Sequence, residues 1–134
     1  MKSNLNIIFF LVVTTFFLIM SSCEDQIESG ADTNLIVLVK FKALPSKSTD
    51  AINGLTKLIE NVRHEPHFVS IKVHIDSKEP SNILLYEEWS DASYYNSAHM
   101  NTPHLLQFRE ESQLFLAGPP EITQWRVEKV FTAE

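Results

Sequence analysis

The spacing of hydrophobic positions changes several times along the chain, and each change predicts a different element. Residues 35–43 are rich in β-branched and large apolar side chains and alternate with polar ones towards their end, which predicts a strand that stops at Pro45. Residues 49–64 place apolar side chains at helical spacing on one face, after residue types that favour an N-cap. They predict an amphipathic helix, and Pro66 lies just past its end.

A β-hairpin is predicted next. Apolar and polar residues alternate between positions 67 and 76, which is the period of a half-buried strand, and His74 lies on its polar side. Residues 77–82 have the composition of a turn, and residues 83–89 form a second run with strand character. The two runs are therefore expected to pair in antiparallel fashion.

Two short helices and a last strand complete the pattern. Asp91 is a suitable N-cap for a helix over residues 91–100, and a proline fits the first turn of a second helix over residues 103–117. Gly118 and the two prolines after it end that second helix. Residues 121–131 alternate in part and predict a closing strand.

This order predicts an α+β protein of ferredoxin-like βαββααβ topology, with one four-stranded antiparallel sheet and helices on one face. The chain of 134 residues has room for one domain of ordinary size, which we place at residues 34–134. The first and last strands carry apolar residues on both sides, so the face without helices predicts a homodimer joined sheet to sheet.

The first residues have the layout of a secretory signal. Lys2 precedes a largely apolar stretch that is shorter than the roughly 20 residues of a membrane-spanning helix, so residues 1–22 are predicted to be a signal peptide. The sequence Leu-Ile-Met-Ser-Ser before Cys23 resembles the lipobox of bacterial lipoproteins, in which the cysteine is acylated. Cys23 is the only cysteine and cannot form an intramolecular disulfide. The alternative is a plain secretory peptide with an accidental cysteine.

An acylated Cys23 would anchor the protein in the cell envelope, at the inner or the outer membrane. Residues 23–33 are polar and lack a period, so they predict a flexible tether. Removal of Lys2 with the signal peptide leaves ten Lys and Arg against seventeen Asp and Glu, and the formal charge changes from −6 to −7. This acidic balance argues against binding to nucleic acid or to anionic lipid head groups through the folded surface.

Two segments carry a resemblance to a known family. Residues 86–91, Tyr-Glu-Glu-Trp-Ser-Asp, end the third strand with a Glu-x-Trp motif, and residues 99–104, His-Met-Asn-Thr-Pro-His, follow a helix. Together with a Pro-Ser-Lys turn at residues 45–47, they make the chain similar to the antibiotic biosynthesis monooxygenase family over residues 35–130. His99 lies ten residues after Trp89, one more than the usual family spacing, which predicts a later helix start or a bulge.

The resemblance implies a dimeric α+β barrel with a cavity between sheet and helices. In some members this cavity oxidises phenolic or quinol substrates with molecular oxygen and without flavin, heme or metal. The implied chemistry is that the substrate loses a proton, its anion reduces oxygen, and the radical pair recombines. A protein base in a water-poor pocket suffices for these steps, so we expect no cofactor.

His99 and His104 are the candidate catalytic bases, because an unperturbed imidazole changes charge near pH ~6.5. A spacing of five is awkward for one helix face, but Pro103 predicts a bend that lets the two rings converge. The alternative is structural: His99 bonded to a backbone carbonyl, and His104 a polar residue of a first helical turn. The sequence leaves both interpretations open.

The candidate substrate-binding residues are aromatic and acidic. Trp89, Tyr95 and Phe108 could line the pocket, although a Trp at a strand end also suits a core. Glu87 and its neighbour Glu88 point to opposite faces of their strand, so only one can face the cavity. A buried carboxylate there requires a partner, for which the sequence offers Arg126 or Lys72.

Metal and heme chemistry fit the sequence less well. No two of the five histidines have the i, i+4 spacing of a helical zinc site. Relatives that degrade heme use an Asn, Trp and His set, but the first strand here lacks Asn and His99 stands at the position of that Trp. The leading hypothesis is therefore a cofactor-independent monooxygenase acting on a small aromatic or quinol compound. The alternative is a non-catalytic ligand-binding or stress-related barrel lipoprotein.

Overall fold

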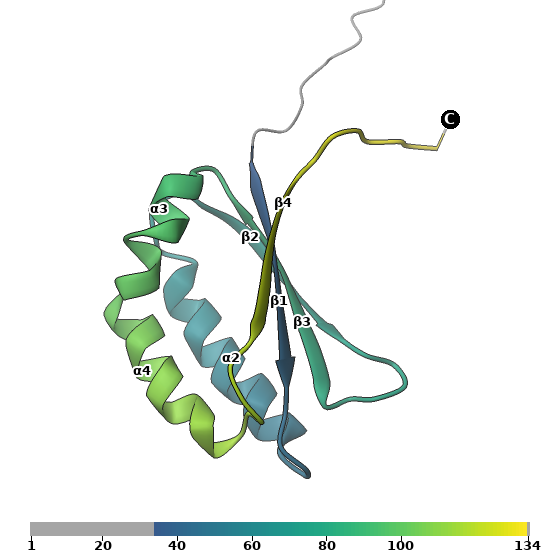
Figure 1. Ribbon diagram of the computed structural model, residues 1–134, viewed down its shortest axis with the longest axis vertical. Helices are drawn as coiled ribbons and strands as arrows, with labels where there is room; N and C mark the ends of the chain where they lie inside the picture. Colours follow the sequence, from purple (N-terminus) through teal and green to yellow (C-terminus); the bar gives the residue numbers. More distant parts are fainter. Residues whose placement is uncertain (1–33, 134) are drawn as a thin grey trace, which may run out of the picture.

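The computed structural model describes residues 34–133, so the predicted signal peptide, the predicted acylation site at Cys23 and the predicted tether lie outside the described residues. The described part forms one four-stranded antiparallel sheet in the order β2-β3-β1-β4, with its helices on one face (Figure 1). Within it, no helix is both long and apolar enough to cross a membrane. The elements are β1 (Leu35–Lys42), α2 (Ser48–Val62), β2 (Phe68–Ile75), β3 (Asn82–Trp89), α3 (Ala92–Asn96), η2 (His99–Asn101), α4 (Pro103–Glu111), η3 (Ser112–Leu114) and β4 (Glu121–Arg126).

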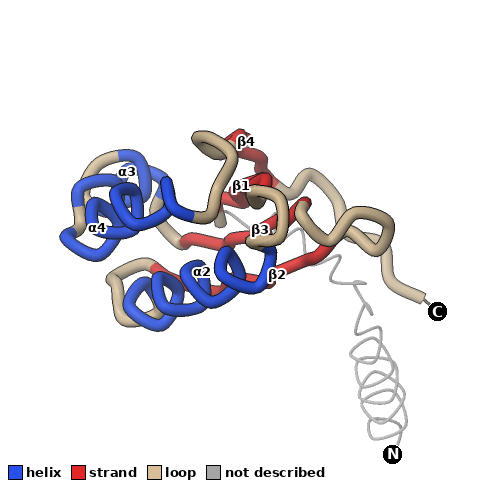
Figure 2. The backbone as a smooth tube through the Cα atoms, turned by 90° about the horizontal axis from the view of Figure 1, so that it is seen from below, coloured by secondary structure: helices blue, strands red, loops and turns tan. Residues whose placement is uncertain are grey.

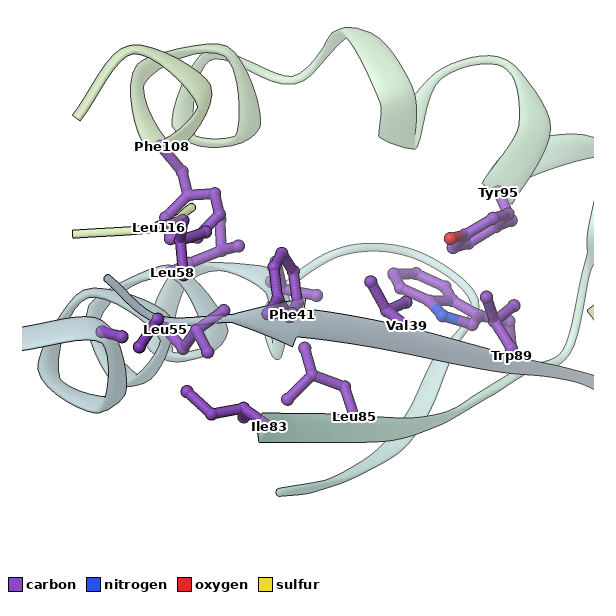
Figure 3. Packing of buried hydrophobic residues seen from close by; sticks show 14 residues of the cluster. Val39, Phe41, Leu55, Leu58, Ile83, Leu85, Trp89, Tyr95, Phe108 and Leu116 are labelled. Atoms are coloured by element: carbon purple, nitrogen blue, oxygen red, sulfur yellow. The ribbon is translucent and has the colours of Figure 1, made fainter. Parts of the chain in front are cut away.

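The predicted ferredoxin-like order of strands and helices is confirmed. Because side chains alternate along a strand, Val37, Val39 and Phe41 of β1 face the helices and are buried. They pack with Leu55 of α2 and with the fully buried Trp89 of β3 (Figure 3). The helices cover one face of the sheet, with α3 beside α4 (Figure 2). Helices α2 and α4 also contact each other, and Lys57 of α2 pairs with Glu111 of α4.

The opposite face of the sheet carries no helix. Ile36 and Leu38 of β1 point to it, where they pair in register with Trp125 and Thr123 of β4. Tyr86 of β3 stands opposite Leu38 on the other side. Trp125 remains 57% exposed, so this face presents apolar side chains to solvent in a single chain.

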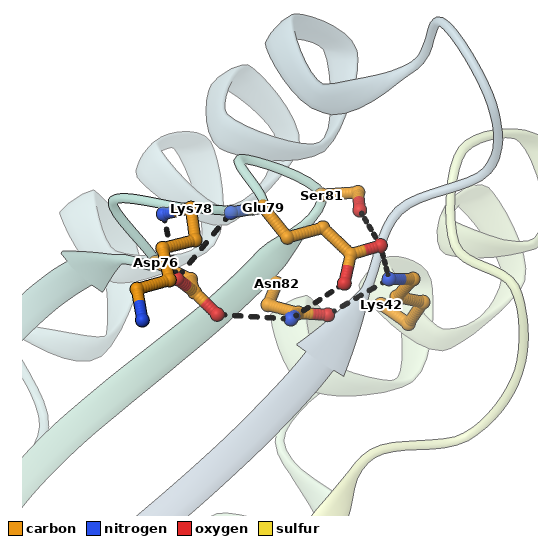
Figure 4. A network of polar contacts seen from close by, with 6 residues as sticks. All are labelled: Lys42, Asp76, Lys78, Glu79, Ser81 and Asn82. Carbon is orange, nitrogen blue, oxygen red and sulfur yellow. Dashed lines mark hydrogen bonds and ion pairs between the residues drawn. The ribbon is translucent and has the colours of Figure 1, made fainter.

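The predicted hairpin turn is held by a network of polar contacts (Figure 4). The Asp76 carboxylate accepts hydrogen bonds from the backbone N–H of Lys78 at 2.8 Å and from the side-chain amide of Asn82 at 3.1 Å. The Lys78 N–H and then the Asn82 amide hold the pKa of Asp76 below its usual value. Glu79 pairs with Lys42 of β1, so the turn is tied to the central strand as well.

The last strand is shorter than predicted. It ends at Arg126 rather than at residue 131, because Arg126 pairs with Leu35, the first residue of β1. Among residues 34–133, no strand lies beyond this pair to continue the ladder. Phe131 accordingly is 89% exposed.

The predicted helices are also interrupted. Asp91 is the N-cap, as expected, and its carboxylate accepts from the Tyr94 N–H at 2.9 Å. The helix nevertheless ends at Asn96, because Ser97 has φ −125° and ψ −81°, outside the helical region. A 3-10 turn, His99–Asn101, then carries His99.

Candidate functional site

A cavity of about 530 Å³ lies between the sheet and the helices. Its wall is mostly apolar: Val39 and Phe41 come from β1, Leu58 from α2, and Leu105 and Phe108 from α4. Tyr95 and Trp89 stand at one end of this group of side chains, and Phe108 and Leu116 at the other (Figure 3). The volume lies within the range of ~300–1,000 Å³ that is usual for small-molecule sites.

His99 reaches this cavity from the 3-10 turn after α3. Its side chain is 7% exposed, its Nδ1 lies 2.9 Å from Oε2 of Glu65, and its ring stacks on Tyr95 with centroids 5.0 Å apart. The Trp89 ring packs against it at 4.6 Å. No side-chain nitrogen in residues 34–133 is both sealed from water and without a partner. His99 lines the cavity, and because Glu65 takes its Nδ1, Nε2 is the ring nitrogen left for a ligand there.

Glu65 organises this end of the site, and sequence analysis missed it. It lies in the turn between α2 and β2, and its side chain is 6% exposed. Besides His99, it binds His104 through an Oε1–Nε2 contact of 2.5 Å and accepts from the Tyr94 hydroxyl at 3.1 Å. The two histidines lie 34 and 39 positions away along the chain, so no local pattern links them to Glu65.

The two predicted bases meet at one carboxylate and not in one void. His104 stands in the first turn of α4 with its Nε2 on Glu65, and its side chain is 25% exposed. His99 lines the large cavity, but His104 is not among the lining residues. The geometry thus leaves His99 as the imidazole that a ligand in the cavity can touch.

Glu87 is the strand carboxyl that faces the cavity. It is 6% exposed, and the indole N–H of Trp89 donates to its Oε2 at 3.1 Å. Burial raises the pKa of Glu87 to about 7, against the lowering effect of the Trp89 hydrogen bond, and the charge of Glu65 adds to the rise. Near neutral pH this carboxyl therefore exchanges a proton readily.

The prediction that Arg126 or Lys72 pairs with the buried carboxylate was wrong. Arg126 lies beside Glu128 at the surface, and Lys72 lies over the ring of Tyr86, 5.4 Å from its centroid. The hydrogen bond to Glu87 comes instead from Trp89, two residues further along the same strand. Residues i and i+2 of a strand share a face, so the Glu-x-Trp motif itself supplies the partner.

The other predicted pocket residues divide by position. Tyr95 and Phe108 line the cavity, and Phe108 meets Phe41 edge to face with ring centroids 6.2 Å apart. Trp89 is fully buried behind the lining, where it supports Glu87 and His99. Burial, followed by the charge of Glu87, raises the pKa of the Tyr95 hydroxyl, so Tyr95 is a hydrogen-bond donor at neutral pH.

The sequence of this chain is similar to that of known proteins. The family model described as antibiotic biosynthesis monooxygenase matches residues 34–111. An uncharacterized protein of Synechocystis sp. is 32% identical over 133 residues, which cover 98% of this chain and 90% of the relative.

Solved structures show the same fold. A protein of Methanosarcina mazei matches with a TM-score of 0.64 and 22% identity, over 71% of this chain and 93% of its own. A Nitrosomonas europaea protein assigned to the antibiotic biosynthesis monooxygenases matches with a TM-score of 0.65 and 18% identity, over 70% of this chain and 89% of its own. At these identities the comparison shows a shared fold and nothing beyond it.

Proposed function

Because this chain belongs to the antibiotic biosynthesis monooxygenase family, we propose that it is a cofactor-independent monooxygenase that oxidises a small aromatic or quinol compound with molecular oxygen. One observation supports this most directly. A mostly apolar cavity of about 530 Å³ is lined by an imidazole whose Nδ1 is bound by a buried carboxylate, which leaves Nε2 as the nitrogen for a ligand. An acid–base group in a water-poor pocket is what the proposed reaction requires.

The proposed steps need no further reductant. His99 accepts the proton of a substrate hydroxyl, and the electron-rich anion transfers one electron to oxygen. The two radicals combine to form a ring peroxide, and loss of water cleaves its O–O bond. A hydroquinone and one oxygen molecule thus give a hydroxyquinone and water, and each product receives one atom of the oxygen molecule. Tyr95 and Glu87 lie on the same cavity wall and can donate hydrogen bonds to the substrate oxygens.

Oxygen consumption tests the enzyme proposal. A panel of reduced benzo- and naphthoquinols should cause oxygen uptake with the wild-type protein, and His99→Ala should abolish it. His104→Ala should weaken it through the loss of a contact to Glu65. Glu60→Ala, at an exposed position on α2 away from the cavity and from the helix-free sheet face, is the control and should retain full activity. Wild-type rates no faster than those of His99→Ala would overturn the proposal, and ligand-induced thermal stabilisation without oxygen uptake would support a binding module instead.

We also propose that the protein is a homodimer joined through the sheet face that carries no helix. Leu38 and Trp125 give this face an apolar character that a single chain leaves partly open to solvent, with Trp125 57% exposed. Light scattering at micromolar concentration should give the dimer mass. Trp125→Glu should shift the protein towards the monomer, and a monomeric wild type would contradict the proposal.

Membrane anchoring through Cys23 is a further part of the proposal, supported by the lipobox-like sequence before it. Cys23→Ser should release the protein from the membrane fraction, because the acyl chains would be its only membrane attachment. Retention of this variant in the membrane fraction would argue against the anchor.

A further inference from the structure

We propose that Glu65 is a positioning residue that fixes His99 in one tautomer, so that the cavity binds compounds presenting a hydroxyl group. This inference deepens the proposed function, since it names the chemical feature that the same site recognises. Its structural part does not require turnover.

Glu65 is surrounded by donors. Its Oε2 lies 2.9 Å from Nδ1 of His99 and 3.1 Å from the Tyr94 hydroxyl, and its Oε1 lies 2.5 Å from Nε2 of His104. A carboxylate can only accept hydrogen bonds, so each of these three atoms must carry a hydrogen directed at it. Three such contacts in a buried position hold the carboxylate in one orientation.

The tautomer of His99 follows from this arrangement. A neutral imidazole has one N–H and one bare nitrogen, and the N–H must lie at Nδ1 to meet Glu65. Nε2 is then an acceptor, and because Nδ1 is taken by Glu65 it is the nitrogen that His99 can offer to a ligand in the cavity that it lines. Tyr95 stacks on one side of the ring with an interplanar angle of 21°, and Trp89 packs nearby, so the ring cannot turn over without displacing both.

His104 serves the same carboxylate from the other side. Its Nε2 is already bound to Glu65 and it does not line the cavity, so it helps to hold Glu65 and does not meet the ligand. This separates the roles of the two histidines. His99 touches the substrate, whereas His104, Tyr94 and Glu65 set its orientation.

An acceptor at the end of an apolar cavity selects hydrogen-bond donors among otherwise similar aromatic compounds. A phenolic or enolic O–H satisfies Nε2, whereas the methyl ether of the same compound leaves it unpaired. Such a lost hydrogen bond corresponds to roughly a tenfold loss of affinity. The proton that His99 accepts in the proposed reaction is the one that makes this hydrogen bond.

The tautomer can be observed in the wild-type protein by 15N NMR of labelled histidine at pH 7.5, with His99 signals identified by their loss in His99→Ala. We expect the neutral His99 ring to have its hydrogen on Nδ1 and a bare Nε2. A hydrogen on Nε2 with a bare Nδ1 would overturn the proposal. The tautomer is read in the wild type without a substrate or a Glu65 variant, so a folding defect in Glu65→Gln cannot obscure it.

Ligand selection is tested with two redox-stable probes, 1-naphthol and 1-methoxynaphthalene, by fluorescence titration. The wild type should bind 1-naphthol about tenfold more tightly than the ether. Glu65→Gln should reduce this ratio towards one, because an amide can donate to Nδ1 and so moves the ring hydrogen to Nε2. Glu60→Gln, an exposed position on α2, is the matched control and should keep the wild-type ratio. Equal binding of the two probes by the wild type would contradict the proposal.

Turnover gives an independent result. With an active quinol, Glu65→Gln should lower kcat by roughly 10²-fold or more with little change in KM, because an ill-oriented base loses its catalytic effect. An unchanged kcat would show that Glu65 does not position His99 for the reaction. If the NMR tautomer and the naphthol preference hold while no quinol consumes oxygen, Glu65 keeps its role in binding and the monooxygenase proposal alone fails.

Discussion

The buried carboxyl of Glu87 should make folding stability depend on pH in an unusual direction. Its pKa is raised from 4.5 to about 7 in the folded protein, mainly by burial. Between these two values the folded state binds more protons than the unfolded state, so stability falls as pH rises. The stability that neutral Glu87 allows is present below about pH 4.5 and is lost by the time the pH has passed about 7.

The size of the effect follows from the shift. A difference of about 2.5 pKa units corresponds to about 3 kcal/mol, of which about 2–3 kcal/mol is lost between pH 5 and pH 8. Glu87 is 6% exposed, so solvent screens little of this amount. Glu87→Gln removes the titration but keeps the volume and an oxygen that accepts from the Trp89 indole. We therefore expect the variant to gain stability relative to the wild type as the pH rises.

Urea unfolding of both proteins at half-unit steps from pH 5 to pH 8 measures this difference. The two stabilities should be closest at pH 5, and the variant should be the more stable at pH 8 by about 2–3 kcal/mol. Glu88→Gln is the control, because Glu88 points to the opposite face and binds Asn34 and Ser70. If the wild type and Glu87→Gln give parallel pH profiles, Glu87 does not titrate as its burial requires, and the reasoning is refuted.

Two further predictions concern backbone and packing. Ser46 has φ 64° in a turn in which the Lys47 N–H donates to the Leu44 carbonyl at 3.0 Å. Glycine adopts this left-handed conformation without strain, so Ser46→Gly should raise stability by about 0.5–1 kcal/mol in thermal unfolding. A lower Tm would contradict this. A Cβ on Gly54 would lie 2.5 Å from Cζ of Phe115, so Gly54→Ala should destabilise by about 1 kcal/mol despite its better helix propensity, and should stabilise instead in a Phe115→Leu background.

The fold was predictable because the pattern that buries each element is local. The alternation in β2 and β3 and the helical spacing in α2 specify which side chains face the core, and the order of elements then limits the topology. The end of β4 was not predictable in this way. Residues after Arg126 still alternate, but whether they form a strand depends on where the partner β1 begins, which is a tertiary fact.

The candidate site was predictable only in part, for a related reason. His99, Tyr95, Phe108 and Glu87 lie in or beside recognisable motifs, and all four line the cavity. Glu65 belongs to no motif that sequence analysis used, and its importance arises from three partners that reach it from α3, η2 and α4. From the sequence alone, a glutamate in a turn is expected at the surface. The tertiary fold is what brings three donors to Glu65.

The two buried carboxyl groups divide the acid–base work at this end of the cavity. Glu65 receives three hydrogen bonds, which suits a carboxylate, whereas Glu87 receives one within the described residues and has a pKa of about 7. Their mutual repulsion contributes to the raised pKa of Glu87. Around neutral pH the acid form of Glu87 therefore offers a donor to the cavity, and neutral His99 offers an acceptor. If a hydroxylated ring lies between them, His99 can remove one proton while the acid form of Glu87 donates a hydrogen bond to the oxygen that gains charge. Raising the pH above about 7 ionises Glu87 and removes this donor.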